Sequence, residues 1–245
     1  MKSILRALVA LLLLTAVGLA DPWVVAHRGG ALGPENLPAT FAKAVALGVD
    51  GVEFDVHLSR DGQVVVLHDH TLLRTFGRVG RVGELTLAQL QAAGVPSLGE
   101  ALEAIGSARP FVEIKQPPEG RYQGLEEAVL EELKAHRCLD RAVIISFDCQ
   151  SLGRIHELAP MATTGLLFGR PEPLEQVVKL GATYAAPHYG LVTKAFMEKA
   201  HRLGLKVSTW TVDDPAALKA MLDLGVEAIT TNQPQRLLDL TPMTR

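Results

Sequence analysis

The sequence predicts an α/β fold, a TIM (β/α)8 barrel with a small insertion after the second barrel strand. The chain has 245 residues, of which 48% are hydrophobic, and this length suits a single barrel of this type. Short apolar runs alternate with amphipathic stretches along most of the chain. The runs are apolar at successive positions, as expected of parallel strands that helices cover on both faces. Repeated strand–helix units of this kind favour a barrel.

The elements follow from these patterns in chain order. We expect strands over Trp23–Ala26, Val52–Val56, Val64–Leu67, Phe111–Lys115, Ala142–Phe147, Thr164–Phe168, Thr183–Ala186, Lys206–Thr211 and Ala228–Thr231. We expect helices over Ala39–Leu47, Leu98–Ile105, Gly124–Arg137, Cys149–Leu158, Leu174–Leu180, Lys194–Leu203 and Pro215–Leu224. The segment Thr71–Pro96 has no strong strand pattern, so we expect an insertion over one end of the barrel, with a short helix at Leu85–Ala92.

Nine strand-like runs are one too many for eight barrel strands, and the connection identifies the extra one. The link Leu58–Gln63 contains the turn signal Ser59-Arg60-Asp61-Gly62. It is too short for the crossover of about a dozen residues that a parallel neighbour requires. We therefore expect Val64–Leu67 to fold back antiparallel on Val52–Val56.

This hairpin predicts which side chains share a face. If residues 59–62 form the loop, Asp55 lies opposite Val66 and Glu53 lies opposite His68. Cross-strand partners share a face, and so do residues two apart on one strand. The two carboxylates and the imidazole would then point the same way. A shift of one residue would break this arrangement.

Residues 1–20 have the layout of a secretory signal peptide. A short basic start precedes the apolar run Ala7–Leu19, and small residues suit cleavage after Ala20. The alternative is an uncleaved anchor, but the run is short for a span of roughly 20 residues. We expect export to a periplasm or out of the cell, a mature barrel domain over 21–245, and no stable membrane span after cleavage.

The net charge is −3 and the pI is about 6.2, which gives no indication of a nucleic-acid partner. Cys138 and Cys149 are the only cysteines, and they flank the expected strand Ala142–Phe147. A disulfide requires Cα atoms within ~7 Å. We therefore expect two free thiols rather than a disulfide.

His27 and Arg28 end the first expected strand. In parallel barrels the chemistry takes place at the carboxyl ends of the strands. A histidine transfers protons near neutral pH, and the planar guanidinium of arginine suits phosphate oxygens. The alternative is a histidine and an arginine that make surface or capping hydrogen bonds.

Three carboxylates predict a metal site. Glu53 and Asp55 share one face of a strand, and Glu113 is similarly placed on its own strand. Buried carboxylates need a cationic partner, and an oxygen-only set favours Mg²⁺ or Ca²⁺ over structural zinc. The alternative is a set of salt bridges to Arg28 and Lys115.

The remaining candidates surround this cluster. His68 ends the hairpin strand and is the second proton-transfer candidate, because two histidines beside a metal-bound phosphate can act as general acid and base. Lys115 shares a face with Glu113 and offers a point charge for phosphate. Trp210 ends the strand Lys206–Thr211 and either walls a substrate pocket or fills the barrel mouth.

The chain resembles the glycerophosphodiester phosphodiesterases along nearly the whole mature chain. The matching stretches are His27-Arg28-Gly29, Pro34-Glu35-Asn36, Gly48-Val49-Asp50-Gly51-Val52-Glu53-Phe54-Asp55-Val56, Asp61-Gly62, Val66-Leu67-His68-Asp69, Leu73-Arg74-Thr75, Pro96-Ser97-Leu98, Glu113-Ile114-Lys115, Gly165-Leu166-Leu167, Trp210-Thr211-Val212 and Thr231-Asn232-Gln233-Pro234. Each piece alone is weak, but their combination and order are specific.

Two positions depart from the pattern. Leu37 replaces a common threonine and Asp213 replaces a common asparagine, and we expect both to affect only loop packing and pocket shape.

The resemblance implies a TIM-barrel hydrolase that cuts glycerophosphodiesters to glycerol 3-phosphate and an alcohol. It implies a divalent ion held by Glu53, Asp55 and Glu113. It also implies His27 and His68 as the acid–base pair, with Arg28 and Lys115 on the phosphate. In this family the glycerol 2-hydroxyl is thought to attack phosphorus, and water then opens the cyclic phosphate.

Two other functions compete with this interpretation. A related barrel acts as a phospholipase D on lysophospholipids, which would need an apolar entrance such as Leu72, Leu73 and Phe76. The other alternative is a protein that binds phosphodiesters without cleaving them. The presence of all the candidate acid–base residues argues against that alternative.

Overall fold

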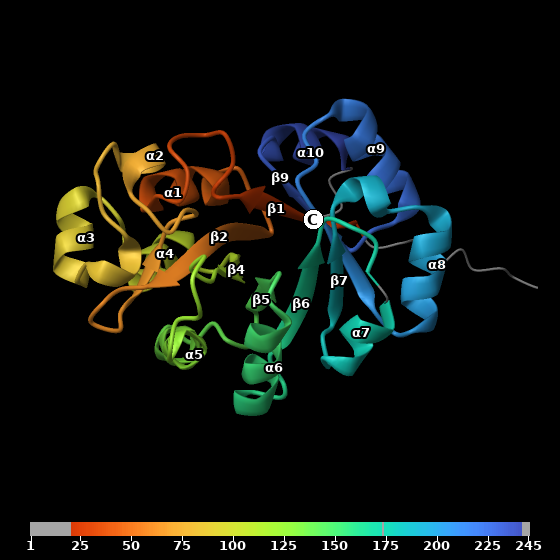
Figure 1. Cartoon of the computed structure of the whole chain (residues 1–245). Coiled ribbons are helices and arrows are strands. Elements are labelled where there is room, and N and C mark those ends of the chain that lie inside the picture. Colours follow the sequence, from red (N-terminus) through yellow and green to blue (C-terminus); the bar gives the residue numbers. More distant parts are fainter. Residues whose placement is uncertain (1–20, 173, 242–245) are drawn as a thin grey trace, which may run out of the picture.

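A closed barrel of eight parallel strands forms the centre of the computed structural model, which describes residues 21–172 and 174–241 (Figure 1). The predicted fold is therefore confirmed. The sheet runs β1-β9-β8-β7-β6-β5-β4-β2-β3, and pairing of β1 with β2 closes it. The strands are β1 (Trp23–His27), β2 (Gly51–Leu58), β3 (Val64–Val66), β4 (Arg109–Ile114), β5 (Val143–Ser146), β6 (Thr163–Phe168), β7 (Tyr184–Pro187), β8 (Lys206–Thr209) and β9 (Ala228–Thr231).

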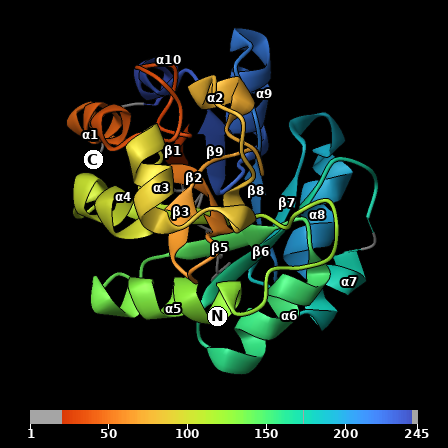
Figure 2. The same ribbon diagram turned by 60° about the vertical axis from the view of Figure 1, so that its left-hand side comes forward.

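Helices surround the strands (Figures 1 and 2). They are α1 (Pro38–Ala46), α2 (Leu73–Phe76), η1 (Val82–Glu84), α3 (Leu87–Ala93), α4 (Leu98–Ile105), α5 (Leu125–Ala135), α6 (Cys149–Leu158), α7 (Leu174–Lys179), η2 (Tyr189–Leu191), α8 (Lys194–Arg202), α9 (Pro215–Leu224) and α10 (Pro234–Leu240). The seven predicted long helices are present, three of them with the predicted bounds. The sequence interpretation missed α10, although Pro234 at its first turn is a typical start signal.

Apolar side chains fill both sides of the barrel wall. Phe54 and Val56 of β2 point outward into the layer between the strands and the helices. Phe111 and Tyr184 point inward, and Trp23 packs on both rings with centroids 6.2 Å away. This alternation leaves the inward positions of β2 at its carboxyl end to polar side chains.

The extra strand folds back as predicted, but its predicted register is wrong by one residue. β3 pairs antiparallel with the end of β2, with Val66 opposite Val56 and Val64 opposite Leu58. The loop therefore has five residues, because the Ser59 amide donates to the Gln63 carbonyl and the hydroxyl of Ser59 accepts from the Gln63 amide. In this register Asp55 does not lie opposite Val66.

The predicted insertion over Thr71–Pro96 is present as a group of short helices beside β2 and β3 (Figure 2). It has an apolar core of its own, which joins the hairpin strand to the insertion. The core consists of Val65, Leu67, Leu72, Val82, Leu90 and Val95.

Three further expectations concern the cysteines, the membrane and the leader. Cys138 and Cys149 are free, as predicted. Among the described residues, none of the helices is both long and apolar enough to span a bilayer. The signal peptide predicted over 1–20 lies outside the described residues, so the peptide and the export remain predictions.

The barrel interior sets a stability test at Gly165 on β6. A Cβ there would lie 3.0 Å from Tyr184 Cβ and 3.2 Å from Ile145 Cγ2. We expect Gly165→Val to lower the free energy of unfolding by about 1–3 kcal/mol through overpacking, measured by urea denaturation. Gly153 on α6 is the control, because a Cβ there meets nothing within 4 Å. Gly153→Ala should stabilise the protein by up to about 1 kcal/mol. Equal effects of the two changes would contradict this packing.

Candidate active site

A tight turn after β1 presents the first two site residues. Arg28 and Gly29 have φ angles of +52° and +89°. A side chain at Gly29 would meet Phe41 and Thr40 at 2.9 Å, so glycine is required there. The turn aims the backbone amide of Arg28 at Glu53, with 2.9 Å between Arg28 N and Glu53 Oε2. The first turn of the site is thus tied directly to β2.

The structure brings the three predicted carboxylates together. Glu53 and Asp55 point inward from β2, and Glu113 lies beside Asp55 in the register of β4. One oxygen from each carboxylate lies within 4.8 Å of the others, and all three side chains are buried. This spacing is compatible with oxygens that share one hard cation.

The salt bridges to Arg28 and Lys115, expected as the alternative to a metal site, are present. Lys115 Nζ lies 2.5 Å from Glu113 Oε1 and 3.2 Å from Asp55 Oδ1. Arg28 Nε lies 3.3 Å from Asp55 Oδ2, and Asn36 donates to the same oxygen. Two cations face three carboxylates. Glu53 Oε1 and Asp55 Oδ1 accept no hydrogen bond, although Asp55 Oδ1 keeps its ion pair. The cluster therefore has oxygens available for a further cation.

Burial and mutual repulsion change the proton affinities of these carboxylates. Burial and the charge of Asp55 raise the pKa of Glu53 and of Glu113 to about 8. Burial alone would raise the pKa of Asp55 too, but Lys115 and Arg28 outweigh it and lower that pKa to about 2. Asp55 is thus the anion that the two cations stabilise. A bound cation would favour ionisation of the other two.

His27 is held from behind by the loop after β9. Its Nδ1 lies 2.9 Å from Asn232 Oδ1, and its Nε2 lies 3.9 Å from Glu53 Oε2. Burial, followed by the charge of Arg28, lowers the pKa of this imidazole. The ring is therefore held in its neutral form near pH 7.

His68 reaches the same pocket by a different route from the predicted one. β3 ends at Val66, and His68 lies two residues beyond, in a loop. The register of β3 on β2 therefore does not orient the His68 side chain. His68 lies in the pocket, as predicted, although the predicted register was wrong by one residue. His57 on β2 holds the loop, because its Nε2 lies 3.0 Å from the His68 carbonyl oxygen.

Charged side chains hold the His68 ring. Its Nδ1 lies 2.7 Å from Asp69 Oδ1, and Arg74 of α2 donates to both oxygens of Asp69. Arg74 also donates to both oxygens of Glu35, which pairs with Arg28. Burial is the main cause that lowers the pKa of His68. Arg74 of the insertion thus links Asp69, which contacts His68, to Glu35, which contacts Arg28.

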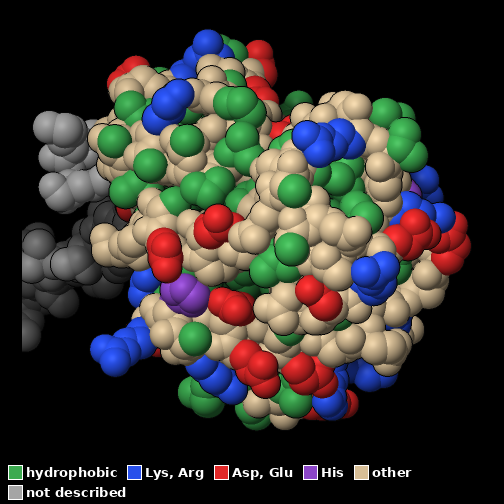
Figure 3. All heavy atoms as spheres, turned by 90° about the vertical axis from the view of Figure 1, so that its left-hand side faces the viewer, with side chains coloured by type: hydrophobic (Ala, Val, Ile, Leu, Met, Phe, Trp, Pro, Cys, Tyr) green, Lys and Arg blue, Asp and Glu red, His purple; other side chains and the backbone are tan. Residues whose placement is uncertain are grey.

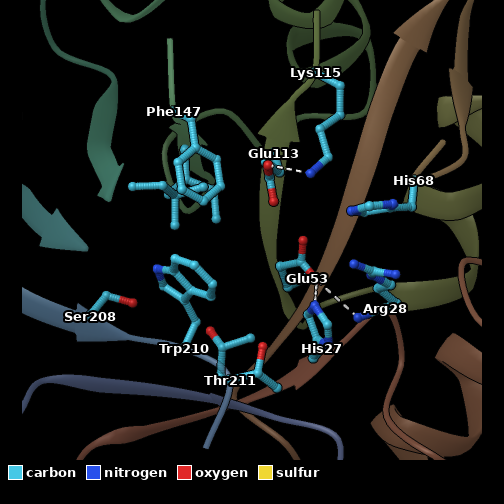
Figure 4. Close-up of a pocket in the computed structure, with 13 residues that line it drawn as sticks. His27, Arg28, Glu53, His68, Glu113, Lys115, Phe147, Ser208, Trp210 and Thr211 are labelled. Carbon is cyan, nitrogen blue, oxygen red and sulfur yellow. Dashed lines mark hydrogen bonds and ion pairs between the residues drawn. The ribbon is translucent and has the colours of Figure 1, made fainter. Parts of the chain in front are cut away.

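These side chains line one pocket at the carboxyl ends of the strands (Figure 4). His27, Arg28 and His68 lie on one side, and Phe147 and Trp210 form an apolar wall across from them. The two aromatic rings pack edge to face with centroids 5.4 Å apart. Trp210 therefore walls the pocket, one of the two predicted alternatives. Asp55 lies beneath the lining, fully buried.

The apolar entrance that a lysophospholipid would need is not formed as expected. Leu72 is buried in the core of the insertion and Phe76 packs against that core. Of the three expected residues only Leu73 is largely exposed. On the face that carries the insertion, acidic and basic side chains are mixed and neither forms a continuous patch (Figure 3).

Sequence reasoning missed the residues that support the site. Asn36, Asp69, Arg74 and Asn232 belong to the quoted motifs, but only their contacts reveal what they do. For Asp213 the sequence predicts an effect on loop packing and pocket shape. Its carboxylate in fact accepts hydrogen bonds from Asn232, next to His27.

Buried carboxylates, two histidines and two cationic side chains meet at the carboxyl ends of the strands of a parallel barrel. This arrangement defines a TIM-barrel enzyme site for an anionic substrate. Residues 27–236 match the model of the glycerophosphoryl diester phosphodiesterase family. The chain therefore belongs to this family and is an enzyme of its class, as the motifs predicted.

Individual relatives agree with this assignment. A glycerophosphodiester phosphodiesterase from Caldanaerobacter subterraneus is 34% identical, over 89% of this chain and 96% of the relative. A crystal structure of a glycerophosphoryl diester phosphodiesterase homologue from Silicibacter pomeroyi has a TM-score of 0.82 at 29% identity, covering 90% of this chain and 94% of that one. A phosphodiesterase from Oleispira antarctica, in complex with the product sn-glycerol-3-phosphate, has a TM-score of 0.80 at 28% identity, covering 89% and 96%.

The buried carboxylates predict a pH dependence of stability in the metal-free protein. Glu53 keeps its proton up to about pH 8 in the folded state, but loses it near 4.5 when unfolded. Its contribution is complete below about pH 4.5 and is lost as the pH rises toward 8. In chelator, we expect Glu53→Gln to gain stability relative to the wild type across this interval. Chemical denaturation at several pH values measures it.

The control for this test is Glu131→Gln, on the exposed face of α5. It should follow the wild-type curve. A constant difference between Glu53→Gln and the wild type at all pH values would contradict the assigned pKa shift.

Proposed function

We propose that the protein hydrolyses glycerophosphodiesters to glycerol 3-phosphate and an alcohol, with a divalent cation and two histidines. One observation carries this proposal. Three buried carboxylates converge within 4.8 Å, and His27 and His68 line the same pocket beside Arg28 and Lys115. The product complex of the Oleispira antarctica relative supports the choice of substrate class.

The carboxylates fit a hard cation. They supply only oxygen atoms, and Glu53 Oε1 and Asp55 Oδ1 are buried without a hydrogen bond. We propose that Glu53, Asp55 and Glu113 hold Mg²⁺ or Ca²⁺. When bound, such an ion neutralises the carboxylates and stabilises charge on phosphoryl oxygens.

The remaining side chains divide the work of binding and proton transfer. Arg28 and Lys115 bind the phosphate oxygens, and the wall of Phe147 and Trp210 packs against the carbon skeleton. One imidazole accepts the proton of the attacking hydroxyl, and the other donates a proton to the leaving alcohol. The family resemblance implies that the attacking group is the glycerol 2-hydroxyl and that water then opens the cyclic phosphate.

Metal removal tests the cation. With chelator, release of glycerol 3-phosphate from glycerophosphocholine should stop, and Mg²⁺ or Ca²⁺ should restore it. The same ion should raise the melting temperature, because it binds only the folded state. In Glu113→Gln both effects should weaken, whereas Glu131→Gln should behave as the wild type. Full turnover in chelator, with no thermal shift, would exclude a metal site here.

Replacement of the histidines tests the acid–base roles. His27→Ala and His68→Ala should each lower kcat by about 10²–10⁴-fold, because each removes one proton transfer. His136→Gln is the control, since His136 caps the far end of α5. Wild-type kcat in either alanine variant would contradict the assignment.

The same assays test the two alternative functions. Turnover by the wild type would exclude the non-catalytic binder, and comparison of the rates on glycerophosphocholine and lysophosphatidylcholine tests the lipid alternative.

A further inference from the structure

The carboxylate of Asp213 accepts three hydrogen bonds, from the last residue of β9 and from the residue that follows it. Its Oδ1 accepts from the Asn232 backbone amide at 2.7 Å and from Thr231 Oγ1 at 3.0 Å. Its Oδ2 accepts from Asn232 Nδ2 at 2.8 Å. The other end of the Asn232 amide, Oδ1, lies 2.9 Å from His27 Nδ1. A continuous chain thus runs from Asp213 through Asn232 to the histidine.

The chemistry of these groups fixes the direction of every bond. An ionised carboxylate only accepts hydrogen bonds, so the amino group of Asn232 must face Asp213. The oxygen of the same amide then faces His27, and an amide oxygen also only accepts. The proton of neutral His27 must therefore lie on Nδ1. Its Nε2, which lies on the side of Glu53, keeps a free lone pair.

We infer that Asp213 is a positioning residue that sets the tautomer of His27 through Asn232. In this tautomer Nε2 is ready to accept a proton in the pocket, so the kinetic part of the inference rests on the proposed function. The tautomer itself is a property of the resting protein. This role goes beyond the expected effect of Asp213 on loop packing and pocket shape.

Replacement by asparagine should reverse the order of donors. In Asp213→Asn, the new amide keeps its oxygen toward the Asn232 backbone amide, because the opposite orientation would set two N–H groups against each other. Its amino group then faces Asn232 Nδ2. Asn232 must turn to avoid this contact, and it would present its amino group to His27. The proton of His27 should move to Nε2.

Exchange of the two side chains should restore the original order. In the double variant Asp213→Asn/Asn232→Asp, the carboxylate at 232 accepts from His27 Nδ1 and from the amide at 213. The single variant Asn232→Asp instead places two carboxylates side by side, which is unfavourable. The exchange thus separates donor order from mere packing, because all three variants keep nearly the same side-chain volumes.

The experiment measures the ¹⁵N shifts of His27 in the full chain labelled with ¹⁵N-histidine, at a pH well above the usual histidine pKa of about 6.5. We expect the Nδ1–H tautomer in the wild type and the double variant, and a shift toward Nε2–H in Asp213→Asn. In parallel, Asp213→Asn should lower kcat on glycerophosphocholine about 10-fold with little change in KM, as is usual for groups that orient a site residue. The double variant should recover most of this loss.

The control is Asp214→Asn, the neighbouring residue, which caps α9 by accepting from the Ala217 amide. Asparagine caps helices equally well, so neither the tautomer nor kcat should change. An Nε2–H tautomer in the wild type, or an unchanged tautomer in Asp213→Asn, would overturn the inference. A double variant that remained impaired in both measurements would also overturn it. A wild type without turnover would reject the proposed function and leave the tautomer result intact.

Discussion

The electrostatic requirement of three buried carboxylates at the mouth of the barrel organises the rest of the site. Glu53, Asp55 and Glu113 are buried and lie close together, and Lys115 and Arg28 fully stabilise the charge of only one of them, Asp55. Such a cluster is costly without a further cation. The turn after β1, the lysine on the loop after β4 and the asparagine at position 36 all point toward these oxygens. The need to neutralise the carboxylates thus explains why polar groups from distant parts of the chain meet here.

The two histidines enter this site with different supports. His27 Nδ1 contacts the neutral amide of Asn232, and that amide in turn donates to the carboxylate of Asp213. His68 contacts a carboxylate directly, and Arg74 of the insertion holds that carboxylate. A carboxylate partner stabilises an imidazolium, whereas an amide oxygen fixes only which nitrogen carries the proton. The two histidines of the pocket therefore differ in the hydrogen-bond partner of Nδ1, an amide for His27 and a carboxylate for His68.

The hairpin shows how far local patterns reach. The short link after β2 predicted the antiparallel strand, because a parallel neighbour needs a longer crossover. The register depended on whether the loop has four or five residues, and the hydrogen bonds between Ser59 and Gln63 decided it. His68 still reached the pocket, because the strand ends before it and contacts with His57 and Asp69 place the loop. The place of His68 in the pocket was thus predicted for a partly wrong reason.

The sequence by itself determined the barrel, its insertion and the charged side chains and histidines that meet at the site, because strand–helix periodicity and residue chemistry are local properties of the chain. It also identified the family, through motifs that occur in one order. Only the tertiary structure decided the supporting contacts, such as Arg74 with Glu35 and Asp213 with Asn232. These pairs join loops far apart in the sequence, and no local pattern encodes which donor will face which acceptor. That pairing arises only when closure of the barrel brings the strand ends together.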